Sequence, residues 1–306
     1  MRLRNRIEGA LMLLALLLAL LLWTPDLDRA TLETRYLQAP GDLVEMDGQR
    51  LHVRDSGPAD APAILMIHGF AASLHTWEPW AQALAGPFRV LRLDLPGSGL
   101  SAPDARGNCR DDRTVALLGA LLDQRGIRRA HLLGHSIGGR IAWTFAATHP
   151  ERVDRLVLLA PDGFASPGFA YGQAPEVPAM LGLMRYVLPA PLLRMNLAPA
   201  YADPATLTDA MHTRYHDLLR APGSRQALLE RMRQTVLVDP VPLLHRIQAP
   251  TLLLWGDRDA FIPTANAEDF LRALPQARLV RLPGVGHVPQ EESPQAGLDA
   301  VRSFLR

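Results

Sequence analysis

The feature that most constrains the fold of this 306-residue chain is the alternation of short apolar runs with longer amphipathic stretches. Apolar runs of strand length occur at residues 63–67, 89–93, 130–133, 155–159, 250–255 and 278–282. Patterns of helical period lie between or after several of them, at residues 77–84, 114–124, 137–148, 265–274 and 294–305. Strands that alternate with helices predict an α/β fold, in which helices cover both faces of a mostly parallel sheet.

The alternation begins after a hairpin signal and stops in the second half of the chain. Residues 43–46 and 50–54 flank Asp47-Gly48, a dipeptide typical of a tight turn. Between about 161 and 248 the pattern is helical, and Leu181, Met184, Val187 and Leu188 could share one apolar face. The predicted organisation is an α/β core (43–160 and 249–306), a helical cap inserted between two strands (161–248) and a polar linker (27–42).

The first 26 residues have the composition of a targeting segment. Arg2, Arg4 and Arg6 precede an apolar run at 10–23, which predicts a signal anchor or a signal peptide. Residues 24–27 offer no small-x-small cleavage site, so an uncleaved membrane anchor is favoured. Arginines on the cytoplasmic side would then place the catalytic domain outside the cytoplasm, at a bacterial inner membrane or in the periplasm. A cleaved segment would instead predict a secreted protein.

Composition excludes several kinds of chemistry. All 32 basic residues are arginine, which rules out a Schiff-base lysine, a phosphate-binding loop ending in Gly-Lys, and a Ser-x-x-Lys nucleophile. Cys109 is the single cysteine, so neither an intramolecular disulfide nor a cysteine metal cluster can form. The net charge of +1 gives no reason to expect nucleic acid as a partner.

Residues 134–138, Gly-His-Ser-Ile-Gly, match the Gly-x-Ser-x-Gly pattern of a nucleophile elbow. The pattern lies between an expected strand and an expected helix, where a sharp turn needs small residues on either side of the serine. This context favours Ser136 as a nucleophile, presented at a helix N-terminus that stabilises developing negative charge.

A serine nucleophile needs a general base, and the base needs an orienting carboxylate. His287 follows the last expected strand in a glycine-containing loop and is the candidate base. Asp257 and Asp259 follow the preceding strand, and one of them is expected to be the acid. The chain order Ser, Asp, His is the one expected for this arrangement of strands and helices.

From about Leu43 onward the sequence resembles the α/β-hydrolase superfamily. The family's acid strand commonly ends in Gly-x-x-Asp-x-x-x-Pro, and Gly256, Asp259 and Pro263 fit this pattern, so the resemblance assigns Asp259 as the acid. A less common variant places the acid at the end of the strand before the insertion, where Asp162 stands.

The resemblance also implies an oxyanion hole and two structural loops. The donors of the oxyanion hole would be the backbone N–H of Ile137 and that of Phe70, which follows a His-Gly pair. His68 would hold this loop, and the motif at residues 94–101 would shape a turn.

Other candidate sites are weaker. Residues 149–154 fit a His-x4-Asp acyltransferase pattern, but they fall at the end of the helix after Ser136. His212, His216 and His245 lack the carboxylate and third ligand of a recognisable metal motif. No metal and no cofactor are therefore predicted.

The predicted function is that of a serine hydrolase acting on a small-molecule substrate through an acyl-enzyme. A serine at the elbow argues against the relatives that open epoxides or cleave carbon–halogen bonds, which carry aspartate there. Carboxylic esters with lipophilic acyl groups are the first choice, because the apolar anchor and cap favour them.

The first alternative is hydrolysis of carbon–carbon bonds in ring-cleavage products. Residues 134–169 resemble such enzymes, although their oxyanion loop usually continues with Gly-Pro-Gly where this chain has Ala71-Ala72-Ser73. Thioester or amide cleavage, perhydrolysis, acyl transfer and a non-catalytic binding role are further alternatives. The sequence does not predict an oligomeric state.

Overall fold

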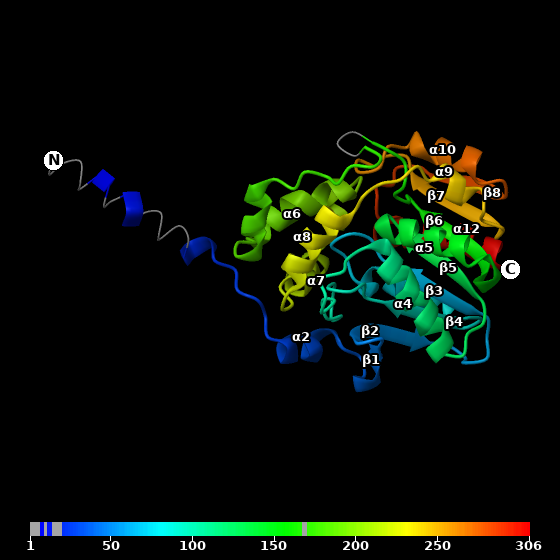
Figure 1. The fold of residues 1–306 in the computed structure, drawn as a ribbon, viewed down its shortest axis with the longest axis horizontal. Coiled ribbons are helices and arrows are strands. Elements are labelled where there is room, and N and C mark those ends of the chain that lie inside the picture. The colour runs from blue at the N-terminus through cyan, green and yellow to red at the C-terminus, as the bar shows by residue number, and fades with distance from the viewer. Residues whose placement is uncertain (1–6, 9–10, 14–19, 167–169) are drawn as a thin grey trace.

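The computed structural model describes residues 7–8, 11–13, 20–166 and 170–306, and an eight-stranded sheet lies at its centre (Figure 1). The strands are β1 (Leu43–Met46), β2 (Gln49–Ser56), β3 (Ala63–Ile67), β4 (Arg89–Leu93), β5 (Ala130–His135), β6 (Val153–Leu159), β7 (Thr251–Gly256) and β8 (Ala277–Leu282). Their order in the sheet is β1-β2-β4-β3-β5-β6-β7-β8. β2 pairs antiparallel with both β1 and β4, and every pairing from β4 to β8 is parallel. The predicted α/β fold is confirmed.

Helices cover both faces of the sheet because the side chains of a strand point alternately to its two faces. On β3, Leu65 and Ile67 pack in the core with the helices α4 (Asp111–Gln124), α5 (Ile137–Thr148) and α10 (Asn266–Ala273). Ile64 and Met66 face the helices α3 (Glu78–Leu84) and α12 (Pro294–Leu305). All four side chains are fully buried, and each such burial stabilises the fold by about 1.5–3 kcal/mol.

The chain between β6 and β7 contributes helices and no strand to this sheet in the part that the structure describes. It contains η4 (Ala179–Arg185), α6 (Ala190–Leu197), η5 (Ala198–Ala200), η6 (Pro204–Thr206), α7 (Asp209–Leu219), α8 (Ser224–Gln234) and α9 (Val241–Leu244). In Figure 1, α6, α7 and α8 gather beside one end of the sheet. We propose that residues 161–248 form the cap and refer to them as the cap segment.

The segment before the sheet carries a helix that packs on the cap segment. Asp28 caps the N-terminus of α2 (Arg29–Tyr36), because its side chain accepts a hydrogen bond from the Thr31 N–H. Leu32 of α2 is buried in a cluster with Leu218 of α7. The predicted linker at 27–42 therefore includes an ordered element.

The predicted membrane anchor is wrong for the residues that the structure describes. None of the helices among the described residues has the length and apolar character that a membrane crossing requires. The predicted anchor is the apolar run at residues 10–23. Part of this run lies outside the described residues. The predictions of a membrane partner and of a membrane-anchored localisation rested on this anchor and are withdrawn with it.

Candidate active site

Ser136 occupies a strained turn between β5 and α5. Its φ of 56° and ψ of −122° lie in a region that residues with a side chain seldom adopt. The glycines around it are required by packing: a Cβ on Gly134 would lie 2.4 Å from the Gly138 carbonyl oxygen, and one on Gly138 would lie 2.3 Å from that of Ile67. The turn thus exists because these neighbours lack side chains.

Asp259 and His287 are brought together by the loops that follow β7 and β8. Asp259 Oδ2 lies 2.8 Å from His287 Nδ1. Its Oδ1 accepts hydrogen bonds from the N–H groups of Phe261 and Ile262 over 2.8 and 2.9 Å, which orients the carboxylate. Bonding through Nδ1 leaves Nε2 of His287 as the nitrogen that can take a proton.

The Ser136 hydroxyl makes no hydrogen bond to His287 within the described part of the chain. Ser136 and His287 are both buried, at 8% and 6% exposure. A looser contact between nucleophile and base is common in structures without substrate.

The other two candidate carboxylates have different partners. Asp162 Oδ2 lies 2.5 Å from a guanidinium nitrogen of Arg140, a residue of α5 that also pairs with Asp111. Asp257 accepts a hydrogen bond from the Gly284 N–H over 2.8 Å, so it joins two loops. Of the three carboxylates, Asp259 is the one that contacts the histidine.

His135, which precedes the nucleophile, is a site residue that sequence reasoning missed. Its Nε2 lies 2.7 Å from the main-chain carbonyl oxygen of His287, and the two rings have centroids 4.7 Å apart. Burial, followed by the proximity of His287, lowers the pKa of His135 well below its usual value, so its ring stays neutral and Nε2 donates to the carbonyl. The pattern Gly-x-Ser-x-Gly leaves this position open, so no sequence signal identified it.

The two candidate oxyanion donors lie on different elements. Ile137 is the first residue of α5, so its N–H has no partner within the helix. Phe70 follows β3 in the oxyanion loop (residues 68–73), and no hydrogen bond within the described residues uses its N–H. Its neighbour Ala71 has a φ of 56°, which marks this loop as tightly folded.

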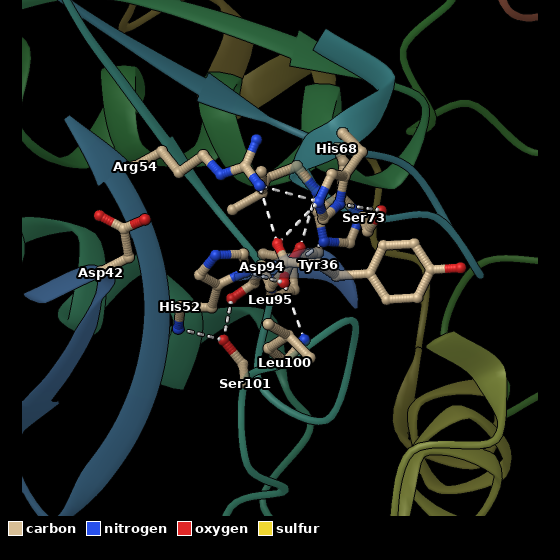
Figure 2. Close-up of polar contacts among 12 residues, drawn as sticks. Tyr36, Asp42, His52, Arg54, His68, Ser73, Asp94, Leu95, Leu100 and Ser101 are labelled. Atoms are coloured by element: carbon tan, nitrogen blue, oxygen red, sulfur yellow. Dashed lines mark hydrogen bonds and ion pairs between the residues drawn. The ribbon is translucent and has the colours of Figure 1, made fainter. Parts of the chain in front are cut away.

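A buried polar network lies beside the oxyanion loop and includes His68 and Ser73 of that loop (Figure 2). Asp94, at the end of β4, accepts hydrogen bonds from the N–H groups of Leu74 and Leu100, over 2.7 and 2.9 Å, and contacts His52 Nδ1 at 2.7 Å. Burial alone would raise the pKa of Asp94, but His52 and the neighbouring histidines hold it far below its usual value. The carboxylate therefore remains ionised.

His68 joins the same two loops through both ring nitrogens. Its Nδ1 donates to its neighbour's carbonyl, that of Gly69, over 2.7 Å, and its Nε2 accepts from the Leu95 N–H over 3.0 Å. Burial lowers the pKa of His68, which keeps the ring neutral and the acceptor available. The loops after β3 and β4 are thus held together by fixed hydrogen bonds.

Two hollows lie near these elements. The larger, of about 180 Å³, runs along α4 and α5 past Arg140 and Trp143, and none of Ser136, Asp259 and His287 lines it. A smaller one lies between the oxyanion loop and the cap segment, with Ala71, Ala72, Ser98, Tyr215, Leu219 and Leu228 among its lining residues. This hollow holds only about 10 Å³, and none of Ser136, Asp259 and His287 lines it. It is a candidate end of the substrate pocket because Ala71 and Ala72, which line it, follow Phe70 in the oxyanion loop.

Two of the histidines that the sequence offered as weaker metal-site candidates contact main-chain carbonyl groups. Nε2 of His212 contacts the Ala190 carbonyl at 2.8 Å, and Nε2 of His216 contacts that of Leu188 at 2.9 Å. Among the described residues no group of three or more histidine, cysteine, aspartate or glutamate side chains could hold a metal ion. Cys109 is buried.

Comparison with known proteins places this geometry in a family context. Residues 62–294 match the family model described as alpha/beta hydrolase fold. The chain is 32% identical over 267 residues to the dihydrolipoyllysine-residue acetyltransferase component of an acetoin cleaving system from Pseudomonas putida, a match that covers 86% of this chain and 68% of the relative. It is 30% identical to a 2-hydroxy-6-oxononadienedioate/2-hydroxy-6-oxononatrienedioate hydrolase from Cupriavidus pinatubonensis, over 84% of this chain and 90% of the relative.

A solved structure also resembles almost the whole chain. A membrane phospholipase A described as a bacterial virulence factor superposes with a TM-score of 0.72 at 27% identity. The superposition covers 99% of this chain and 98% of that one.

Proposed function

The chain belongs to the alpha/beta hydrolase fold family, and on that premise we propose that it is a serine hydrolase whose nucleophile is Ser136. The hydrogen bond of 2.8 Å between Asp259 and His287 carries this proposal. Together with a strained serine at the start of a helix, it supplies the nucleophile and the oriented base that this mechanism needs.

The proposed reaction follows from the roles of these groups. His287 Nε2 takes the proton of Ser136 as Oγ bonds to a substrate carbonyl carbon, and Asp259 stabilises the imidazolium. The N–H groups of Phe70 and Ile137 bind the oxyanion. When the tetrahedral intermediate collapses, the leaving group departs with the proton from His287. Water then adds to the acyl-enzyme by the same route and releases the acid.

For the bond that is cleaved, the curated relatives support carbon–carbon hydrolysis better than the ester hydrolysis that the sequence favoured. The relative from Cupriavidus pinatubonensis hydrolyses a 2-hydroxy-6-oxo dicarboxylate, as its name states, and a meta-cleavage product hydrolase from Pseudomonas fluorescens has a similar fold. We therefore take hydrolysis of a carbon–carbon bond next to a carbonyl as the first candidate.

Ester hydrolysis stays as a second candidate, because no charged side chain is among the described residues that line the candidate pocket. Apolar side chains such as Leu219 and Leu228 line it. A dicarboxylate needs a cation, yet Arg214, the neighbour of the lining residue Tyr215, is paired with Glu291. The similarity to a phospholipase A points the same way.

A single comparison separates the candidates. The full chain is assayed on p-nitrophenyl esters of graded acyl length and on a ring-cleavage dienoate, beside Ser136→Ala. Turnover of the dienoate, with esters much slower, supports carbon–carbon cleavage, and the reverse supports ester cleavage. Turnover that persists in Ser136→Ala would contradict the serine mechanism.

A further inference from the structure

The loop that carries His287 is bound to the cap segment as well as to the core. The His287 N–H donates to the Ala200 carbonyl over 2.7 Å. Glu292 accepts from the N–H groups of Gly286 and Asp203, over 2.6 and 3.0 Å. Because Ala200 and Asp203 belong to the cap segment, the position of the base depends on that segment.

Glu291, four residues after His287, is the centre of a second attachment. Its side chain is 4% exposed. The hydroxyls of Tyr201 and Tyr215 donate to its Oε2 over 2.9 and 2.7 Å, and Arg214 pairs with its Oε1. Burial, followed by the charge of Glu291, raises the pKa of both tyrosines, so both hydroxyls stay protonated and donate.

The two tyrosines differ in what their rings contact. Tyr215 lines the candidate pocket beside the oxyanion loop and packs in one apolar cluster with Ala71 and Ala72. Tyr201 shares the acceptor oxygen of Glu291 and does not line this pocket. Tyr215 therefore contacts both the candidate pocket and, through Glu291, the helix α11 (Pro289–Glu292) that follows His287.

We propose that Tyr215 is a specificity-determining and positioning residue, whose ring limits the acyl pocket while its hydroxyl fixes the loop carrying His287. This rests on the proposed function, since it assigns Ser136 as nucleophile and His287 as base. The ring and the hydroxyl make separate contributions, so different substitutions separate them.

Labelling of Ser136 by alkyl fluorophosphonates with methyl, butyl and octyl chains measures both contributions, whichever substrate the enzyme takes. Tyr215→Phe removes only the hydroxyl, and Tyr201→Phe is the matched control with the same acceptor. Each is expected to slow labelling about 3- to 10-fold, equally for all chain lengths, because one hydrogen bond to Glu291 is lost.

Removal of the ring is expected to act on selectivity. Tyr215→Ala should change the ratio of octyl to methyl labelling rates by about fivefold or more, because the pocket is enlarged. Tyr201→Ala should leave that ratio unchanged. Thermal unfolding confirms that each variant is folded, and Tyr215→Leu replaces Tyr215→Ala if the latter is not.

Three results are decisive. Wild-type labelling rates in Tyr215→Phe, or an unchanged ratio when the ring is removed, would overturn this inference while the proposed function stands. A wild-type chain that reacts no differently from Ser136→Ala would overturn the proposed function, and this inference with it.

Discussion

At the scale of single residues, backbone strain at Ser136 distinguishes this serine from others in the chain. A residue with a side chain at a φ of 56° and a ψ of −122° costs of order 1–3 kcal/mol, which the surrounding packing must offset. Such strain is commonly retained where a side chain has to be presented in one direction.

This strain leads to a first prediction. Ser136→Gly and Ser136→Ala both remove the hydroxyl and should both abolish labelling, but only glycine relieves the strained φ. We expect Ser136→Gly to be more stable than Ser136→Ala by about 0.5–2 kcal/mol in urea unfolding. Equal stabilities would show that the turn is not strained.

Gly138 gives a second prediction. Alanine in a helix is normally more favourable than glycine, but here its Cβ would meet the carbonyl oxygens of Ile67 and His68 at 2.3 and 2.4 Å. We expect Gly138→Ala to lower the free energy of unfolding by about 2–3 kcal/mol and to slow labelling of Ser136.

Gly86→Ala is the matched control, because a Cβ there meets nothing within 4 Å. Its stability should change by less than about 1 kcal/mol. A Gly138→Ala variant as stable as this control would contradict the close approach between α5 and the loop after β3.

At the scale of elements, the network around Asp94 joins the ends of β3 and β4 and contains a buried histidine. His75 of η2 (Leu74–Trp77) lies near Arg54 and is 9% exposed. Burial chiefly, with the charge of Arg54, lowers its pKa to about 3, although Asp94 opposes the shift.

The sign of the resulting pH dependence follows from linkage. The folded pKa of His75 lies below the unfolded value of about 6.5, so the unfolded chain binds the proton more readily. Its contribution to stability is complete above about pH 6.5 and is lost as the pH falls toward 3.

The third prediction concerns this window. Between pH 7 and pH 5, wild type should lose about 1–2 kcal/mol more stability than His75→Gln, which cannot take up a proton there. Urea unfolding at the two pH values measures the difference, and parallel losses in both proteins would contradict a neutral, buried His75.

At the scale of the whole molecule, the N-terminal segment, the cap segment and the core are attached to one another. Asp217 of α7 accepts from Arg35 and from the Tyr36 hydroxyl, over 2.7 and 2.8 Å. Asp26 pairs with Arg225 of α8 at 2.5 Å. The segment around α2 therefore helps to hold α7 and α8, which both line the candidate pocket, in place.

A fourth prediction tests this attachment. Leu32→Ala removes a side chain that is 1% exposed against Leu218, and it should cost about 2–4 kcal/mol and speed proteolysis within α7 and α8. Leu192→Ala, at a 48% exposed position of the cap segment, should change neither measurement appreciably. If the two variants behave alike, α2 does not stabilise the cap segment.

Much of the fold was determined by the sequence alone, because strands and helices depend on periodic burial and local turn residues. The limits of α5 and α12 and of β1, β3 and β4 agree with the predicted ranges. The resemblance to α/β-hydrolases is confirmed by the family match, and the candidate catalytic residues fall at strand ends, where short motifs identify them.

The tertiary structure alone decided which groups touch. The family motif around Asp259 favoured it over Asp162 as the acid, but only the structure shows their partners, a histidine for Asp259 and an arginine for Asp162. His135, Glu291 and Tyr215 have no motif, because their roles depend on contacts between segments far apart in the chain. The membrane anchor was predicted from apolar composition, whereas crossing a membrane requires a long apolar helix, and none of the helices among the described residues is one.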